Sequence, residues 1–209
     1  QISESIELHQ KLNKEDARKK TVEMLKLVRI PEPEKQYNQY PHHFSGGMRQ
    51  RVMIAMALSC RPKLLIADEP TTALDVTIQS QIIYETQKLC KEIGTAIIWI
   101  THDLAVVAGL ADRVCVMYAG RDVEQGNVNT VIDNPKHPYT KGLISSIPAN
   151  NKRKEPLFQI NGIPPSLKGT DDSCSFFNRC NKSKIKCKTE AIHNYFVNDR
   201  SYRCFYPYK

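Results

Sequence analysis

Two adjacent carboxylates, Asp68 and Glu69, follow an apolar run at residues 64–67 and have the chemistry of a hydrolytic metal site. The run predicts a buried strand of a parallel sheet, and open α/β sheets bind their ligands at the carboxyl ends of such strands. Mg²⁺ prefers oxygen ligands, and a second carboxylate can act as a base toward water. We therefore expect Asp68 to hold Mg²⁺ and Glu69 to polarise a water molecule.

A second segment, SGGMRQ at residues 45–50, has the composition of a phosphate-binding site. Its glycines leave backbone N–H groups bare, and residues 48–58 predict a helix. The N-terminus of a helix attracts anions because its first N–H groups have no partner within the helix. The segment is therefore suited to contact a phosphate.

Two shorter motifs follow in the sequence: ALD at residues 73–75, and THD at residues 101–103 after an apolar strand predicted at 96–100. Either tripeptide alone is a weak signal, since a histidine beyond a strand is more often structural. Together and in this order, the four motifs resemble the signature, Walker B, D-loop and switch-histidine motifs of the ATP-binding-cassette (ABC) family. The resemblance implies ATP hydrolysis between two paired subunits.

The resemblance also implies a role for each motif. Glu69 is then the general base, Asp68 binds Mg²⁺ directly or through water, and His102 contacts the γ-phosphate. Asp75 reaches across the dimer, and the signature contacts the γ-phosphate held by the opposite subunit. The residues that it assigns to nucleotide binding are Ser45, Gly46, Gly47, Gln50 and Asp75.

The sequence contains no G-x-x-x-x-G-K-[ST] loop, which cradles the phosphates of ATP in this family. The family places that loop and a glutamine loop ahead of the signature, and the chain also lacks an initiating Met. We therefore interpret it as the C-terminal portion of a longer ATPase. By itself it is expected to lack ATPase activity and measurable ATP affinity, to expose apolar faces of the strands at 64–67 and 96–100, and to fold poorly or self-associate.

Alternating strand and helix patterns predict an α/β fold with a parallel sheet. Residues 14–30 predict an amphipathic helix, residues 76–93 a long helix stopped by Gly94, and residues 104–111 a short one. A hairpin over 113–118 and 121–125 is expected to lead through a turn at Gly126 into a helix near 127–133. On the amphipathic helix, the residues predicted to share one face are Ala17, Thr21, Met24, Leu25 and Val28.

The resemblance to the ABC family implies that this α/β fold is a partial P-loop NTPase core. We expect a helical subdomain with the signature at residues 1–60, half of the catalytic core at 61–136, and a cysteine-bearing extension at 137–209. The net charge of +8 lies mostly in this extension, since residues 151–209 carry 12 Lys and Arg against 5 Asp and Glu. A solvated surface is the simplest explanation, and attraction to RNA or anionic lipid is the alternative.

Four cysteines of the extension are grouped closely enough to act together: Cys174, Cys180, Cys187 and Cys204. Hydrolytic ATP motifs imply the cytosol, where cysteines are usually thiols or metal ligands. Because the extension resembles that of peptide-importer subunits, a [4Fe-4S] cluster is implied, which Cys₄ ligation and the surrounding positive charge would suit. Four thiols without a ligand, or an adventitious disulfide in a purified sample, are an alternative of equal weight to the cluster. A zinc site ranks third, because the cysteine spacings differ from those of ordinary zinc sites. The other three cysteines, Cys60, Cys90 and Cys115, are expected in the core.

Segments 44–58, 63–76, 118–121 and 137–143 resemble the ATP-binding subunits of dipeptide and oligopeptide importers, with nickel importers as close relatives. That resemblance implies a second ATP-binding subunit, two membrane permease subunits and, indirectly, a substrate-binding protein. It places the chain peripherally at the cytoplasmic face of a bacterial inner membrane. Two other interpretations remain open: an ABC ATPase acting on nucleic acid or the ribosome, and a non-catalytic gene remnant.

Overall fold

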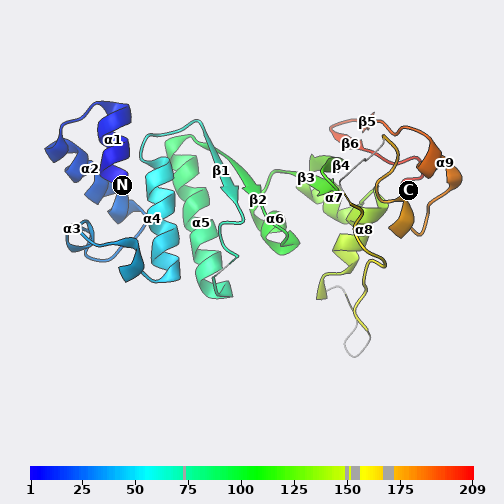
Figure 1. The fold of residues 1–209 in the computed structure, drawn as a ribbon, viewed down its shortest axis with the longest axis horizontal. Helices are drawn as coiled ribbons and strands as arrows, with labels where there is room; N and C mark the ends of the chain where they lie inside the picture. The colour runs from blue at the N-terminus through cyan, green and yellow to red at the C-terminus, as the bar shows by residue number, and fades with distance from the viewer. Residues whose placement is uncertain (73, 149–150, 152–155, 167–171) are drawn as a thin grey trace. The chain divides into compact units, whose positions relative to one another are not determined.

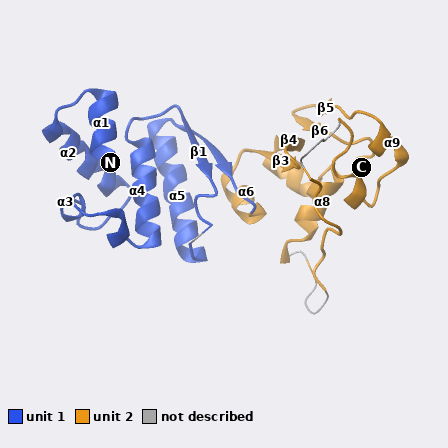
Figure 2. Cartoon of the chain, in the orientation of Figure 1, with its two compact units in different colours: residues 1–102 blue, residues 103–209 orange. Residues whose placement is uncertain are grey.

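A computed structural model describes residues 1–72, 74–148, 151, 156–166 and 172–209. The chain forms two compact units, residues 1–102 and 103–209 (Figure 2). Ala73, the first residue of the predicted D-loop motif, lies outside the described residues. Within those residues, no helix has the length and apolar character needed to cross a membrane.

Unit 1 consists of helices packed against a two-stranded parallel sheet (Figure 1). Its core contains Ile6 of the first helix, Leu25 and Leu58 of the next two long helices, and Cys90. Leu65 and the other inward strand residues pack against this core. The elements of unit 1 are α1 (Ile2–Gln10), α2 (Lys14–Leu27), α3 (Pro33–Gln36), η1 (Pro41–His43), α4 (Gly46–Leu58), β1 (Leu64–Asp68), α5 (Val76–Ile93) and β2 (Ala96–Ile100).

The long helices of unit 1 lie close to the bounds that the sequence predicts, although α2 ends at Leu27 rather than at residue 30 and α4 begins at Gly46 rather than at residue 48. α5 has the predicted bounds: Asp75 accepts a hydrogen bond from the Ile78 N–H (3.0 Å) at its start, and Gly94 takes a left-handed conformation (φ 80°) at its end. α2 buries the predicted apolar face and ends at Leu27, ahead of Pro31. Sequence signals at the helix ends, as well as tertiary packing, therefore determine where these helices begin and end.

The strands β1 and β2 are less buried than the sequence predicts. Leu65 and Ile97 pack on the helices, but Leu64, Ile66 and Ile98 are 46–60 % exposed. Successive side chains of a strand point to opposite faces, so one face of this sheet joins the core while the other is solvated. The prediction of fully buried strands is wrong for that face, and the expected exposure of apolar strand residues is confirmed.

An ionic cluster connects three helices of unit 1. Glu85 on α5 is only 8 % exposed and contacts Arg51 on α4, which also donates to the Val28 carbonyl at 3.0 Å. The other carboxylate oxygen of Glu85 lies 3.1 Å from the guanidinium of Arg29, just beyond α2. Removing the acid would leave a largely buried arginine without its partner, which is strongly destabilising.

We therefore predict that Glu85→Ala lowers the free energy of unfolding of unit 1 by about 3–5 kcal/mol, measured by urea denaturation. The matched control is Glu92→Ala on the same helix, because Glu92 is exposed and lies 3.9 Å from Lys88. An exposed pair of this kind is worth less than about 1 kcal/mol. Equal effects of the two substitutions would show that the cluster does not hold the helices together.

Unit 2 is built around a four-stranded antiparallel sheet in the order β3-β4-β6-β5. The predicted hairpin is confirmed, with positive φ at Ala119 (49°) and Gly120 (77°) in its turn. The pair β5–β6 was not predicted, because strands of three residues leave no alternating pattern. The elements of unit 2 are α6 (Leu104–Leu110), β3 (Arg113–Tyr118), β4 (Arg121–Asn127), α7 (Val128–Asp133), α8 (Pro138–Ser145), η3 (Phe177–Arg179), α9 (Ile185–Thr189), β5 (Tyr195–Val197) and β6 (Arg200–Tyr202).

Gly126 does not begin a turn, which corrects the sequence prediction. It lies inside β4, opposite Val114. A Cβ at this position would lie 3.3 Å from side-chain atoms of both Arg200 and Val131. The glycine therefore makes room for the packing of β6 and α7 on β4.

Candidate functional site

The ends of β1 and β2 bring the predicted catalytic residues together. The strands pair in parallel with Asp68 opposite Ile100, and the Glu69 N–H donates to the Ile100 carbonyl at 2.9 Å. His102 Nδ1 then lies 3.0 Å from Glu69 Oε1. Glu69 is thus fixed by its backbone and by a side chain from the neighbouring strand end.

The contacts of Glu69 keep its carboxyl group ionised. Hydrogen bonds from His102 and then from the Thr72 hydroxyl (3.0 Å) lower the pKa of Glu69 below its usual value. Because a carboxylate only accepts hydrogen bonds, Nδ1 of His102 carries the proton in this contact. The pair therefore presents an anionic, oriented carboxylate at an exposed strand end, as a base toward water requires.

Asp68 ends β1 with an exposed side chain, next to Glu69 in the sequence. Among the described residues, no group of three or more His, Cys, Asp or Glu side chains could hold a metal ion. Mg²⁺ in phosphoryl-transfer sites usually takes one or two carboxylates and completes its shell with water and phosphate oxygens. Asp68 alone at the strand end fits that mode of binding.

The start of α4 forms a second group of predicted residues. Ser45 caps the helix by accepting from the Met48 N–H at 3.3 Å. Gly47 lies against α5, since a Cβ there would lie 2.9 Å from Ile78 Cγ2, and α5 itself is capped by Asp75. Gly46 is the first residue of α4, and Gln50 lies half-buried on its second turn.

The structure thus gathers the predicted residues of unit 1 in two groups. Ser45, Gly46, Gly47 and Asp75 lie at two packed helix starts, while Asp68, Glu69 and His102 lie at the strand ends. Within the described residues, no hydrogen bond or ion pair joins the two groups. Unit 1 therefore presents the helix start that the sequence predicts to contact a phosphate separately from the carboxylate–histidine pair.

Comparison with known proteins identifies the relationship. Residues 2–72 match the family described as ABC transporter, and residues 123–187 match the family described as Oligopeptide/dipeptide transporter, C-terminal region. The oligopeptide transport ATP-binding protein OppD of Escherichia coli K12 is 49 % identical over 207 residues, which are 99 % of this chain and 61 % of OppD. The chain is a homologue of peptide-transporter ABC ATP-binding proteins.

Other relatives agree with this assignment. OppD of Bacillus subtilis 168 is 60 % identical over 80 % of this chain and 47 % of its own length. The dipeptide transport ATP-binding protein DppD of the same organism is 49 % identical over 90 % of this chain and 56 % of its own length. The chain therefore spans about half to three fifths of these ABC proteins.

A solved structure supports the fold. CbiO1 from Clostridium perfringens, described as part of the ABC transporter complex cbiONQ, is 36 % identical with a TM-score of 0.55. The match covers 63 % of this chain and 51 % of CbiO1. The predicted α/β fold of the ABC ATPase type is confirmed.

In unit 2, the four grouped cysteines of this ABC homologue line one small cavity: Cys174, Cys180, Cys187 and Cys204. All four are free thiols in the structure, and the Cys174 N–H donates to the Cys187 carbonyl at 3.0 Å. Burial raises the pKa of Cys174 and Cys180, and that of Cys204 to about 12. Without a bound ligand that favours the thiolate form, the thiols of Cys174, Cys180 and Cys204 therefore stay protonated.

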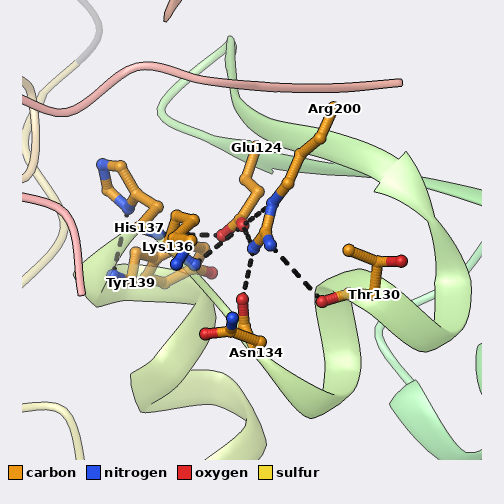
Figure 3. A network of polar contacts seen from close by, with 7 residues as sticks. All are labelled: Glu124, Thr130, Asn134, Lys136, His137, Tyr139 and Arg200. Atoms are coloured by element: carbon orange, nitrogen blue, oxygen red, sulfur yellow. Dashed lines mark hydrogen bonds and ion pairs between the residues drawn. The ribbon is translucent and has the colours of Figure 1, made fainter. Parts of the chain in front are cut away.

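A buried ionic network stands beside this cavity. Glu124 on β4 is 1 % exposed and accepts from Arg200 Nε (3.0 Å) and from the N–H groups of Lys136 (2.8 Å) and His137 (2.9 Å) (Figure 3). The same arginine donates to the Asn134 carbonyl at 2.6 Å. Sequence reasoning missed Glu124 and Arg200, whose only signal is a charge within a short strand.

His137 connects this network to the start of α8. Its Nδ1 accepts from the Tyr139 N–H at 3.0 Å, which confirms the capped turn considered for this segment. Thr140 and Gly142 of α8 are buried, so α8 is not merely a surface helix. His137 is 2 % exposed and lines the cysteine cavity, and its burial lowers its pKa to about 4.

A histidine with a lowered pKa makes folding sensitive to acid. Between about pH 6.5 and pH 4 the unfolded state binds the proton and the folded state does not, so stability falls as the pH falls. We predict that His137 accounts for a loss of about 3 kcal/mol in the unfolding free energy of unit 2 over this range. His137→Asn retains a side chain able to cap α8 and removes the titrating group.

The measurement is urea denaturation of the wild type and of His137→Asn at pH 7, 5.5 and 4. Carboxyl groups titrate in both proteins, so the difference between the two curves isolates His137. The wild type is expected to lose stability more steeply than the variant. Parallel curves would contradict the assignment of a neutral, buried imidazole.

Proposed function

We propose that this chain belongs to the ATP-hydrolysing subunit of a bacterial peptide-type ABC importer. The observation that carries the proposal is the 3.0 Å contact between Glu69 and His102 at the ends of two paired parallel strands. The match of residues 123–187 to the C-terminal region of oligopeptide and dipeptide transporters supports peptides as the transported class. An ABC ATPase acting on nucleic acid has no comparable support.

In the proposed mechanism, Glu69 orients the attacking water and accepts its proton. A positioned base of this kind contributes about 10²–10⁴-fold to the rate. His102 holds the carboxylate in place and contacts the γ-phosphate, while Asp68 holds Mg²⁺. When bound, Mg²⁺ neutralises charge on the phosphate oxygens, and the residues at the strand end supply position and proton transfer.

The proposed enzyme works as a dimer of ATP-binding subunits. Ser45, Gly46 and Gly47 offer a capped helix start to the γ-phosphate held by the opposite subunit, with Gln50 on the next turn. Asp75 caps the start of α5, which packs against the start of α4, and in the proposed dimer it contacts the opposite ATP-binding subunit. Two permease subunits and, indirectly, a substrate-binding protein complete the importer, with this subunit peripheral at the cytoplasmic face of the inner membrane.

We predict that Glu69→Gln, in the full-length protein with its partner subunits, lowers ATP turnover by about 10²–10⁴-fold and leaves ATP binding intact. The amide keeps the size of the side chain but cannot accept the proton, and Asp68 still holds the metal. Steady-state phosphate release and equilibrium nucleotide binding measure the two effects separately. A control in the same unit is Glu92→Gln, an exposed residue of α5. Wild-type turnover in Glu69→Gln would remove this residue from the proposed role.

We further propose that the four cysteines of unit 2 hold a [4Fe-4S] cluster. Their convergence on one cavity supports a shared ligand, and Cys₄ ligation suits such a cluster. Among the described residues no group of three or more His, Cys, Asp or Glu side chains could hold a metal ion, which applies to a cluster and to zinc alike, so the proposal rests on the shared cavity and on the resemblance of the extension. Binding of a cluster would also favour the thiolate form and so offset the cost of ionising buried thiols.

The prediction is that anaerobically purified protein carries iron and a brown charge-transfer absorption. Changing any one of Cys174, Cys180, Cys187 or Cys204 to Ser should remove the colour and most of the iron. Cys115→Ser is the matched control. The core position expected for Cys115 is wrong, because this residue is exposed on β3, and it lies outside the cavity. A colourless, iron-free wild type whose stability is unchanged in the four variants would leave these residues as ordinary thiols.

A further inference from the structure

The last residues of the chain lie along a row of lysines that comes earlier in unit 2. We call residues 205–208 the aromatic segment. Lysine ammonium groups lie over its rings in reverse sequence order, within the distance at which cation–π attraction acts. The three pairs are Lys182 with Tyr208 (4.1 Å to the ring centre), Lys184 with Tyr206 (4.6 Å) and Lys186 with Phe205 (4.8 Å).

Two hydrogen bonds support the same arrangement. Lys182 Nζ donates to the Pro207 carbonyl at 2.9 Å, and the Tyr208 N–H donates to the Lys136 carbonyl at 2.9 Å. We call Lys182, Lys184 and Lys186 the lysine row. Lys186 Nζ also lies 3.4 Å from the Glu190 carboxylate, and both of these side chains are about half exposed. The aromatic segment is therefore held by side chains of the lysine row and by the loop that precedes α8.

The aromatic segment begins directly after Cys204. Three of the four cavity cysteines lie within residues 174–187, but Cys204 reaches the cavity from a separate part of the chain. On its N-terminal side it is fixed by β6 and by the Arg203 N–H, which donates to the Val123 carbonyl at 2.9 Å. On its C-terminal side, Phe205 and Tyr206 line the same cavity as the thiols, together with Lys182.

We propose that the lysine–aromatic pairs are positioning contacts that hold Cys204 beside the other three cysteines and so complete the four-thiol site. Without them, β6 would still bring the chain to the cavity, but the residues after Cys204 would be held over it chiefly by the hydrogen bond from the Tyr208 N–H to the Lys136 carbonyl. The buried, protonated thiol of Cys204 would then become accessible to solvent reagents. The proposal concerns the protein before any metal binds, so it stands or falls separately from the iron–sulfur proposal.

The test is the rate at which N-ethylmaleimide alkylates Cys204 in metal-free, full-length protein, resolved by peptide mass spectrometry. Lys182→Met with Lys184→Met retains the apolar stems and removes the charges. We expect Cys204 to react about tenfold faster, which corresponds to about 1.4 kcal/mol in the closing equilibrium. Tyr206→Leu should act in the same direction, because it removes a ring and keeps an apolar side chain.

Conservative variants separate cation–π attraction from general packing. Lys182→Arg with Lys184→Arg and Tyr206→Phe retain charge over a ring and should react at close to the wild-type rate. Lys188→Met, an exposed change on α9, and the reaction of buried Cys90 in unit 1 serve as controls. A wild-type rate in the Met and Leu variants would overturn the proposal. Arginine variants as reactive as the methionine ones would overturn it as well.

Discussion

Five residue pairs join β1 to β2 in parallel register, and the position of every proposed catalytic group in unit 1 depends on that register. With Asp68 opposite Ile100, the residues that leave the two strands emerge at one edge of the sheet. The hydrogen bond from the Glu69 N–H to the Ile100 carbonyl continues the ladder beyond the strands. A shift of one residue would displace His102 by about 3.3 Å and reverse the faces of the strand, so the contact with Glu69 would be lost.

The helices hold this register from one side only. Leu65 and Ile97 enter the core formed by α1, α2, α4 and α5, and the buried Glu85 fixes α5 to α4 through Arg51. The close approach of Gly47 to Ile78 sets the start of the signature helix against the start of α5. One packed layer thus orients both the strand ends and the helix starts, while the opposite face of the sheet exposes its apolar side chains.

The sequence predicts the local features of unit 1 well because they rest on short-range rules. The bounds of α5 follow from a cap at Asp75 and from Gly94, and the β2 strand follows from its apolar run. The apolar run of β1 does not itself show how many layers cover it, and the exposure of one face was expected only from the interpretation of the chain as a portion of a longer ATPase. Gly126 was misassigned because its role, making room for Arg200, depends on a strand far away in the sequence. For the same reason the Glu124–Arg200 pair and the lysine–aromatic pairs emerge only from the structure, while the roles of Glu69 and His102 in catalysis remain predictions.

The central claim is that Glu69 and His102 form one hydrolytic unit because the β1–β2 register joins them. A double-mutant cycle on ATP turnover in the full-length protein, with Glu69→Gln, His102→Ala and the combined variant, tests this most directly. Residues that act as a unit have non-additive effects, so the combined variant should be no slower than the slower single variant. If the two losses instead multiply, the residues act independently and the account of a joined pair is contradicted.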